Sequence, residues 1–66
     1  MTLNDFFAAL QNPNMVVSVT QNNVELTKIY ASGYEQLLES LLLETVSKIT
    51  IVNQNSCTVE LEYVSA

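Results

Sequence analysis

The amino-acid sequence predicts a single small α+β domain with the element order α-β-β-α-β-β. Apolar residues recur at helical spacing in two segments, and each segment is followed by alternating apolar and polar residues that a turn divides into two strands. We expect the two β-hairpins to form a small antiparallel or mixed sheet. Both helices are expected to pack on one face of this sheet, within one domain over residues 1–66.

The first helix is expected at about residues 3–11. Thr2 and Asp5 are spaced as in a capping box, in which each side chain satisfies a free backbone amide at the start of the helix. The apolar residues that follow share one helical face: Leu3, Phe6, Phe7 and Leu10. Pro13 ends the helix, because proline lacks an amide hydrogen and restricts the residue before it.

The first hairpin is expected at about residues 15–30. Asn22 and Asn23 lie between two alternating stretches, and asparagine tolerates the positive φ angles of a two-residue turn. This turn pairs Thr20 with Glu25 on the face away from the core. The residues expected on the core face are Met15, Val17, Val19, Leu26 and Tyr30.

The second helix is expected at about residues 33–46. Ser32 and Glu35 have the spacing of another capping box. The residues that follow at helical spacing on one face are Tyr34, Leu37, Leu38, Leu41, Leu42 and Thr45. Because β-branched residues begin at the end of this stripe, we expect the change to a strand near Ser47.

The second hairpin is expected at about residues 48–64. Its apolar residues share one face only if the connecting loop has an odd number of residues. A three-residue loop at positions 54–56 would pair Ile51 with Val59. The residues placed on the core face are Ile49, Ile51, Cys57, Val59, Leu61 and Tyr63.

The size of the chain predicts a need for extra stabilisation. Sixty-six residues can build one core, and domains this small commonly depend on a disulfide, a metal or a partner subunit. Cys57 is the only cysteine and the chain has no histidine, so neither an internal disulfide nor a histidine-containing zinc site is available. We therefore expect a homo-oligomer, a dimer above all, or a complex with another protein.

The charge balance excludes several classes of partner. Two lysines stand against seven acidic residues, which gives a net charge of −5 and no basic cluster for direct nucleic-acid binding. The longest apolar run, at residues 41–43, is far too short to span a membrane, and the N-terminus lacks the basic start of a signal peptide. A cytoplasmic location is expected.

The sequence offers no catalytic residue, cofactor site or metal site, and no small-molecule substrate is expected. Glu60 and Glu62 could be written as a carboxylate pair, but strand alternation already places both toward solvent. Cys57 has no histidine to activate it and fits a small buried residue. Gly33 is the only glycine and Asp5 the only aspartate, so neither a glycine-rich phosphate loop nor a calcium loop can be built.

Apolar residues that the predicted core does not use indicate a possible interface. In the expected register, four valine and isoleucine side chains lie on the sheet face away from the helices, and Leu43 lies on the acidic side of the second helix. The four are Val16, Ile29, Val52 and Val64. Residues scattered on the surface for their β propensity would give the same pattern.

Glu35, Glu39 and Glu44 suggest a different binding surface. On a helix the first two would be one turn apart, and the acidic face could imitate the phosphates of nucleic acid and occupy a basic groove. An ordinary solvated helix face explains the same residues.

The segment Ala31–Leu37, between an N-terminal helix with a hairpin and a closing hairpin, resembles small acidic proteins of prophages and mobile elements in Gram-positive bacteria. That family has no assigned activity, so the resemblance implies no site residues. The sequence thus favours a non-enzymatic interaction or structural module. An acidic inhibitor that blocks a nucleic-acid-binding protein of the host is the alternative.

Overall fold

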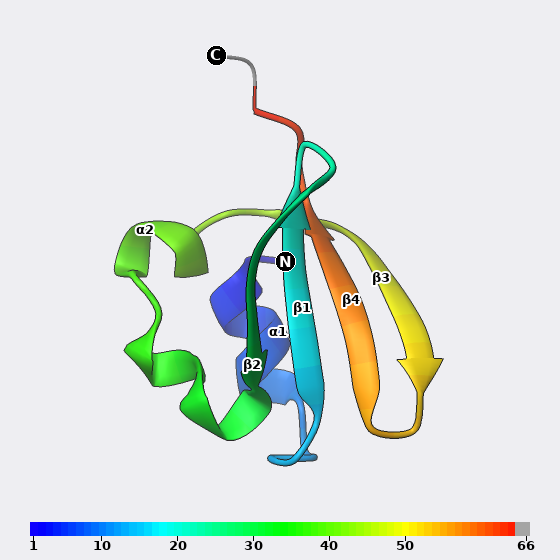
Figure 1. Cartoon of the computed structure of the whole chain (residues 1–66). Coiled ribbons are helices and arrows are strands. Elements are labelled where there is room, and N and C mark those ends of the chain that lie inside the picture. The colour runs from blue at the N-terminus through cyan, green and yellow to red at the C-terminus, as the bar shows by residue number, and fades with distance from the viewer. Residues whose placement is uncertain (65–66) are drawn as a thin grey trace.

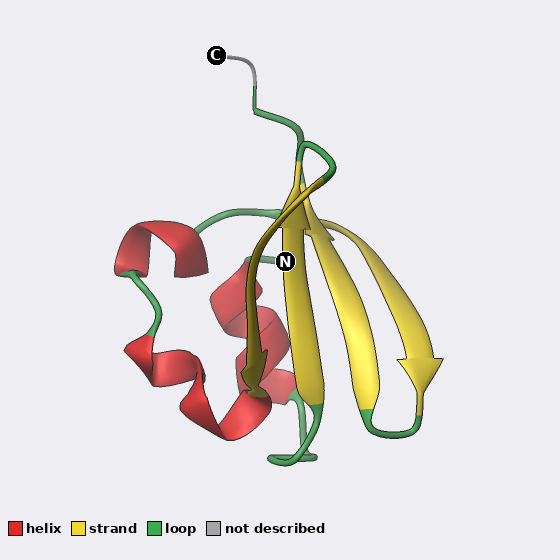
Figure 2. Ribbon diagram, in the orientation of Figure 1, coloured by secondary structure: helices red, strands yellow, loops and turns green. Residues whose placement is uncertain are grey.

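The computed structural model describes residues 1–64 and shows a small α+β fold with a four-stranded mixed sheet (Figures 1 and 2). The strand order is β2-β1-β4-β3: two antiparallel hairpins are joined by parallel pairing of the central strands β1 and β4. The strands are β1 (Val16–Gln21), β2 (Val24–Tyr30), β3 (Val46–Asn53) and β4 (Ser56–Leu61). Three short helical elements accompany them: α1 (Leu3–Ala9), the 3-10 helix η1 (Ala31–Gln36) and α2 (Glu39–Leu42).

Helix α1 begins as predicted. The Thr2 amide donates to Asp5 Oδ2 and the Asp5 amide donates to Thr2 Oγ1. Each of these hydrogen bonds is 3.2 Å long, and together they complete the capping box. Leu3, Phe6 and Phe7 are buried on the expected face. The helix ends at Ala9, two residues earlier than expected, because the next residue is already extended.

The first hairpin has the predicted turn and a different register beyond it. Asn22 and Asn23 have φ angles of 54° and 66°, and Thr20 pairs with Glu25 as expected. Leu26 is then an extra residue in a β-bulge, which shifts every later pair by one. Uninterrupted alternation would have turned Lys28 toward the core. The bulge avoids the cost of burying that charge, because Lys28 instead pairs with Ser18 on the outer face.

In the second hairpin the apolar residues share one face as predicted, but the register and the turn length differ from those expected. Ile49 pairs with Val59 and Ile51 with Cys57, two residues off the expected register. The turn has only two residues, and the odd residue that the face pattern requires is Val52, left unpaired in a bulge.

The expected continuous helix over residues 33–46 was wrong. Leu37 and Leu38 are extended, with ψ angles of 153° and 139°, and they separate η1 from α2. Tertiary contacts override the helical pattern, as is usual for short helices: Tyr34 stacks on Phe7 with ring centroids 5.1 Å apart, and the Ala31 amide donates to Met15 O over 2.8 Å.

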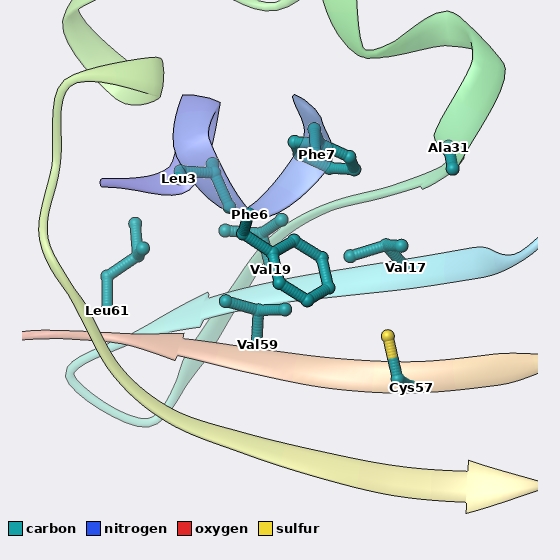
Figure 3. Close-up of a cluster of buried hydrophobic side chains, with 9 residues drawn as sticks. All are labelled: Leu3, Phe6, Phe7, Val17, Val19, Ala31, Cys57, Val59 and Leu61. Atoms are coloured by element: carbon teal, nitrogen blue, oxygen red, sulfur yellow. The ribbon is translucent and has the colours of Figure 1, made fainter. Parts of the chain in front are cut away.

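The core lies between α1 and the two central strands (Figure 3). Helix α1 and the strands β1 and β4 supply all but one of its nine buried side chains, and η1 supplies Ala31. The members are Leu3, Phe6, Phe7, Val17, Val19, Ala31, Cys57, Val59 and Leu61. No residue of β3 belongs to this core, because the helices lie toward the β2 side of the sheet (Figure 1).

Candidate interaction surface

The five residues expected at an interface do not form one patch. Val16 is half-buried on the outer face, and Val52 is the exposed bulge residue of β3. Val64 follows β4, where its backbone exchanges hydrogen bonds of 2.9 and 3.0 Å with the side chain of Asn22. Leu43 is exposed at the end of α2.

Ile29 requires a correction. It was expected on the outer face, but the bulge in β2 pairs it with Val17 and packs it against the core. The cause is the same shift that moves Lys28 outward.

The outer face of the sheet is polar instead. Cross-strand partners share a face, so the registers place the side chains of Lys28, Ser18, Thr58 and Thr50 in one row across all four strands. The next row contains Glu25, Thr20, Glu60 and Lys48. Hydroxyl and charged groups thus occupy the middle of the face on which the sequence predicted an apolar patch.

Both edge strands carry three exposed apolar side chains: Val24, Leu26 and Tyr30 in β2, and Ile49, Ile51 and Val52 in β3. Ile51 is 65% exposed, Val52 63% and Ile49 40%. The two isoleucines lie on the same face as the core, since they pair with Cys57 and Val59. The helices lie toward the β2 side of the sheet and do not extend over β3 (Figures 1 and 2). We call Ile49, Ile51 and Val52 the β3 edge. The sequence reasoning missed it because it assumed that the helices would cover all four strands.

The backbone of Ile49 and Ile51 faces the open side of this strand. Hydrogen-bonded and non-bonded pairs alternate along an antiparallel ladder. The Glu62 amide donates a 2.9 Å hydrogen bond to Thr45 O, so Glu62 is at a hydrogen-bonded position of β4. Every second residue before it, Glu60 and Thr58, is then also at a bonded position. These two residues pair with Lys48 and Thr50. The N–H and C=O groups of the intervening Ile49 and Ile51 therefore point away from β4, toward the free edge.

The other edge strand, β2, has a lysine among the residues whose backbone groups are free. The Ala31 amide donates to Met15 O, so Met15 and every second residue after it in β1 are at positions hydrogen-bonded to β2. Lys28 and Tyr30 pair with the residues between these positions, so their backbone groups point to the free side of β2. Lysine on an edge strand discourages pairing with another strand. At the β3 edge the residues with free backbone groups carry isoleucine side chains.

The acidic residues do not form the expected helix face. Glu35 is in η1, Glu39 begins α2, and the extended pair Leu37 and Leu38 lies between them. Glu44 follows α2, and its carbonyl accepts a 2.9 Å hydrogen bond from the Leu3 amide. The spacing of one helical turn, on which the phosphate imitation depended, is therefore absent.

Two hollows and a buried cysteine are further features of residues 1–64. A hollow of about 360 Å³ lies between α1 and η1, beside Phe7 and Tyr34, and one of about 220 Å³ lies beside Asn22 and Glu60. Burial raises the pKa of the Cys57 thiol. Among residues 1–64, no three His, Cys, Asp or Glu side chains are grouped so that they could hold a metal ion. No helix in this part of the chain has the length and apolarity to cross a membrane.

At the β3 edge, exposed apolar side chains and free backbone groups thus coincide at two alternate residues, Ile49 and Ile51. On β2 only Tyr30, 62% exposed, combines the two, and it lies beside Lys28. No protein-family model, curated protein or solved structure matches the chain.

Proposed function

We propose that this chain is a non-enzymatic protein-interaction module that binds its partner by strand addition at the β3 edge. The observation that carries the proposal is the coincidence, at Ile49 and Ile51, of side chains 40% and 65% exposed with backbone groups that face the free side of the sheet. An added strand uses main-chain hydrogen bonds for affinity and alternate side chains for specificity.

Strand addition at this edge sets requirements for a partner. The partner must offer an extended segment with unpaired backbone groups, and its side chains next to the isoleucines must be apolar, because a charge placed there would lose its hydration without a counter-charge. Lys48 is the only charged residue in β3, so charge contributes little to the pairing.

Residues of the β3 edge can be substituted without disturbing the core. Ile51 and Val52 lie outside the buried core, and the backbone groups of Ile51 do not bond to β4 in the alternation described above. A polar substitution at Ile51 should therefore change binding while leaving the sheet intact, which makes the proposal testable.

The test compares Ile51→Lys with Val24→Lys. Val24 is 57% exposed and lies on the other edge strand, so it controls for an added positive charge at a similarly exposed apolar position. Tagged wild-type chain should retain a bound protein, an untagged copy of itself included, from cell lysate. Val24→Lys should retain it as well, and Ile51→Lys should lose it.

Hydrogen exchange on the purified complex adds a readout of strand pairing. The Ile49 and Ile51 amides should exchange quickly in the free chain and slowly in the complex. Binding that survives Ile51→Lys, or a complex in which these two amides still exchange quickly, would contradict strand addition at β3.

A further inference from the structure

We infer that the strand added at the β3 edge is β3 of a second copy, in an antiparallel pair centred on Thr50, which joins two four-stranded sheets into one continuous sheet. This inference rests on the proposed function and names its partner.

The residue order of β3 around Thr50 is self-complementary. In a two-fold antiparallel pair centred on Thr50, Ile49 lies opposite Ile51 of the second copy, and Ile51 opposite Ile49. These are the residues whose backbone groups face the free side, so both pairs can exchange N–H to C=O hydrogen bonds. All four isoleucine side chains then lie on the same face of the joined sheet.

The distribution of charge favours pairing of two copies through β3. The chain carries a net charge of −5, so two copies repel each other wherever their acidic residues meet. None of the seven acidic residues lies in β3. In the register centred on Thr50, Lys48 lies near Val52 of the second copy and not near its own equivalent, so the two lysines are not opposed.

The bulges in β3 limit the register in which two copies can pair. The ladder between β3 and β4 is irregular at Ser47 and again at Val52, and the regular stretch between them runs from Lys48 to Ile51. Moving the centre of symmetry to Ile49 or Ile51 would bring a bulge residue or its neighbour into the pairs that must exchange hydrogen bonds. The register centred on Thr50 uses only regular positions for these pairs.

The assembly closes at two copies. Pairing through β3 consumes the β3 edge of both chains and leaves the two β2 edges at the ends of the joined sheet, where Lys28 carries free backbone groups. A dimer is expected, not a fibre.

Cysteine cross-linking tests the register. In the dimer Thr50 faces its own equivalent across a non-hydrogen-bonded pair, where Cα atoms are about 4.5 Å apart, within the roughly 4.4–6.8 Å that a disulfide spans. In a Cys57→Ala background, Thr50→Cys should form a covalent dimer under mild oxidation. Thr58→Cys is the matched control, because Thr58 pairs with Thr50 on the same outer face but lies one strand further in.

Light scattering measures the assembly itself. The wild-type chain should show twice the mass of one chain as its concentration rises, and Ile51→Lys should show the mass of one chain with unchanged circular dichroism. A wild-type chain that keeps the single-chain mass up to about 1 mM would overturn the inference. Cross-linking of Thr58→Cys as readily as Thr50→Cys would also overturn it.

These failures differ from failure of the proposed function. If the wild-type chain is a monomer but Ile51→Lys abolishes capture of a different protein, self-pairing is wrong and strand addition stands. If Ile51→Lys changes neither the mass nor any captured protein, both proposals are wrong.

Discussion

Truncating Ile51 to alanine should weaken self-association by an amount that can be worked from its exposure. The side chain is 65% exposed in the single chain. An added strand covers one flank, which we take as about half of the exposed part, or roughly a third of an isoleucine. Full burial of such a side chain contributes about 1.5–3 kcal/mol, so the truncation costs about 0.5–1 kcal/mol per copy and about 1–2 kcal/mol per dimer. The dissociation constant should rise about 5- to 30-fold.

The assay is sedimentation velocity over a dilution series, which gives the dissociation constant for wild type and variant. Val24→Ala is the control, because Val24 is 57% exposed on the opposite edge strand and should leave the constant unchanged. Urea unfolding of both variants checks that the single chain keeps its stability. A change of less than twofold in Ile51→Ala, or an equal change in the control, would refute the reasoning.

Three further predictions concern the fold. Leu3→Ala should remove about 2–5 kcal/mol from the free energy of unfolding, since Leu3 is fully buried, and thermal unfolding should show a chain at the limit of stability. Asn22→Gly keeps a residue that tolerates the positive φ of the turn but removes both hydrogen bonds from the Asn22 side chain to the Val64 backbone. The Val64 amide should therefore exchange faster with solvent, whereas Asn23→Gly should leave the exchange rate of this amide unchanged. Because burial raises the pKa of the Cys57 thiol, the folded chain keeps this proton at a pH where the unfolded chain loses it. That contribution to stability is complete below the ordinary pKa of 9.0 and is lost as the pH rises above it; urea titrations should show the loss, and Cys57→Ala should abolish it.

Local sequence signals predicted the features that local interactions determine. The capping box at Thr2 and Asp5 formed because its two hydrogen bonds join residues three apart. The turn at Asn22 and Asn23 formed because its φ angles depend on the residues themselves. Both features could be predicted without knowledge of the sheet.

Features set by tertiary packing were missed. The second helix had the clearest periodicity, yet Leu38 is 75% exposed and Tyr34 reaches the core through its stack on Phe7. The bulge at Leu26 had a sequence signal in retrospect, because regular alternation required Lys28 to face the core. The β3 edge had none, since exposure of Ile49 and Ile51 depends on how far the helices extend over the sheet, and a pattern of alternation is the same whether or not a helix covers it.

The two edge strands present different residues at their free edges. Both contain bulges, but the bulges have opposite consequences for the residues beside them. In β2 the bulge at Leu26 turns Lys28 outward, among the residues whose backbone groups are free. In β3 the bulges at Ser47 and Val52 lie at the ends of a short regular stretch that keeps Ile49 and Ile51 at the free edge. A long regular apolar edge would pair in many registers and aggregate. A stretch this short offers one register, so the irregularities that limit aggregation would also make the proposed pairing with a second copy specific.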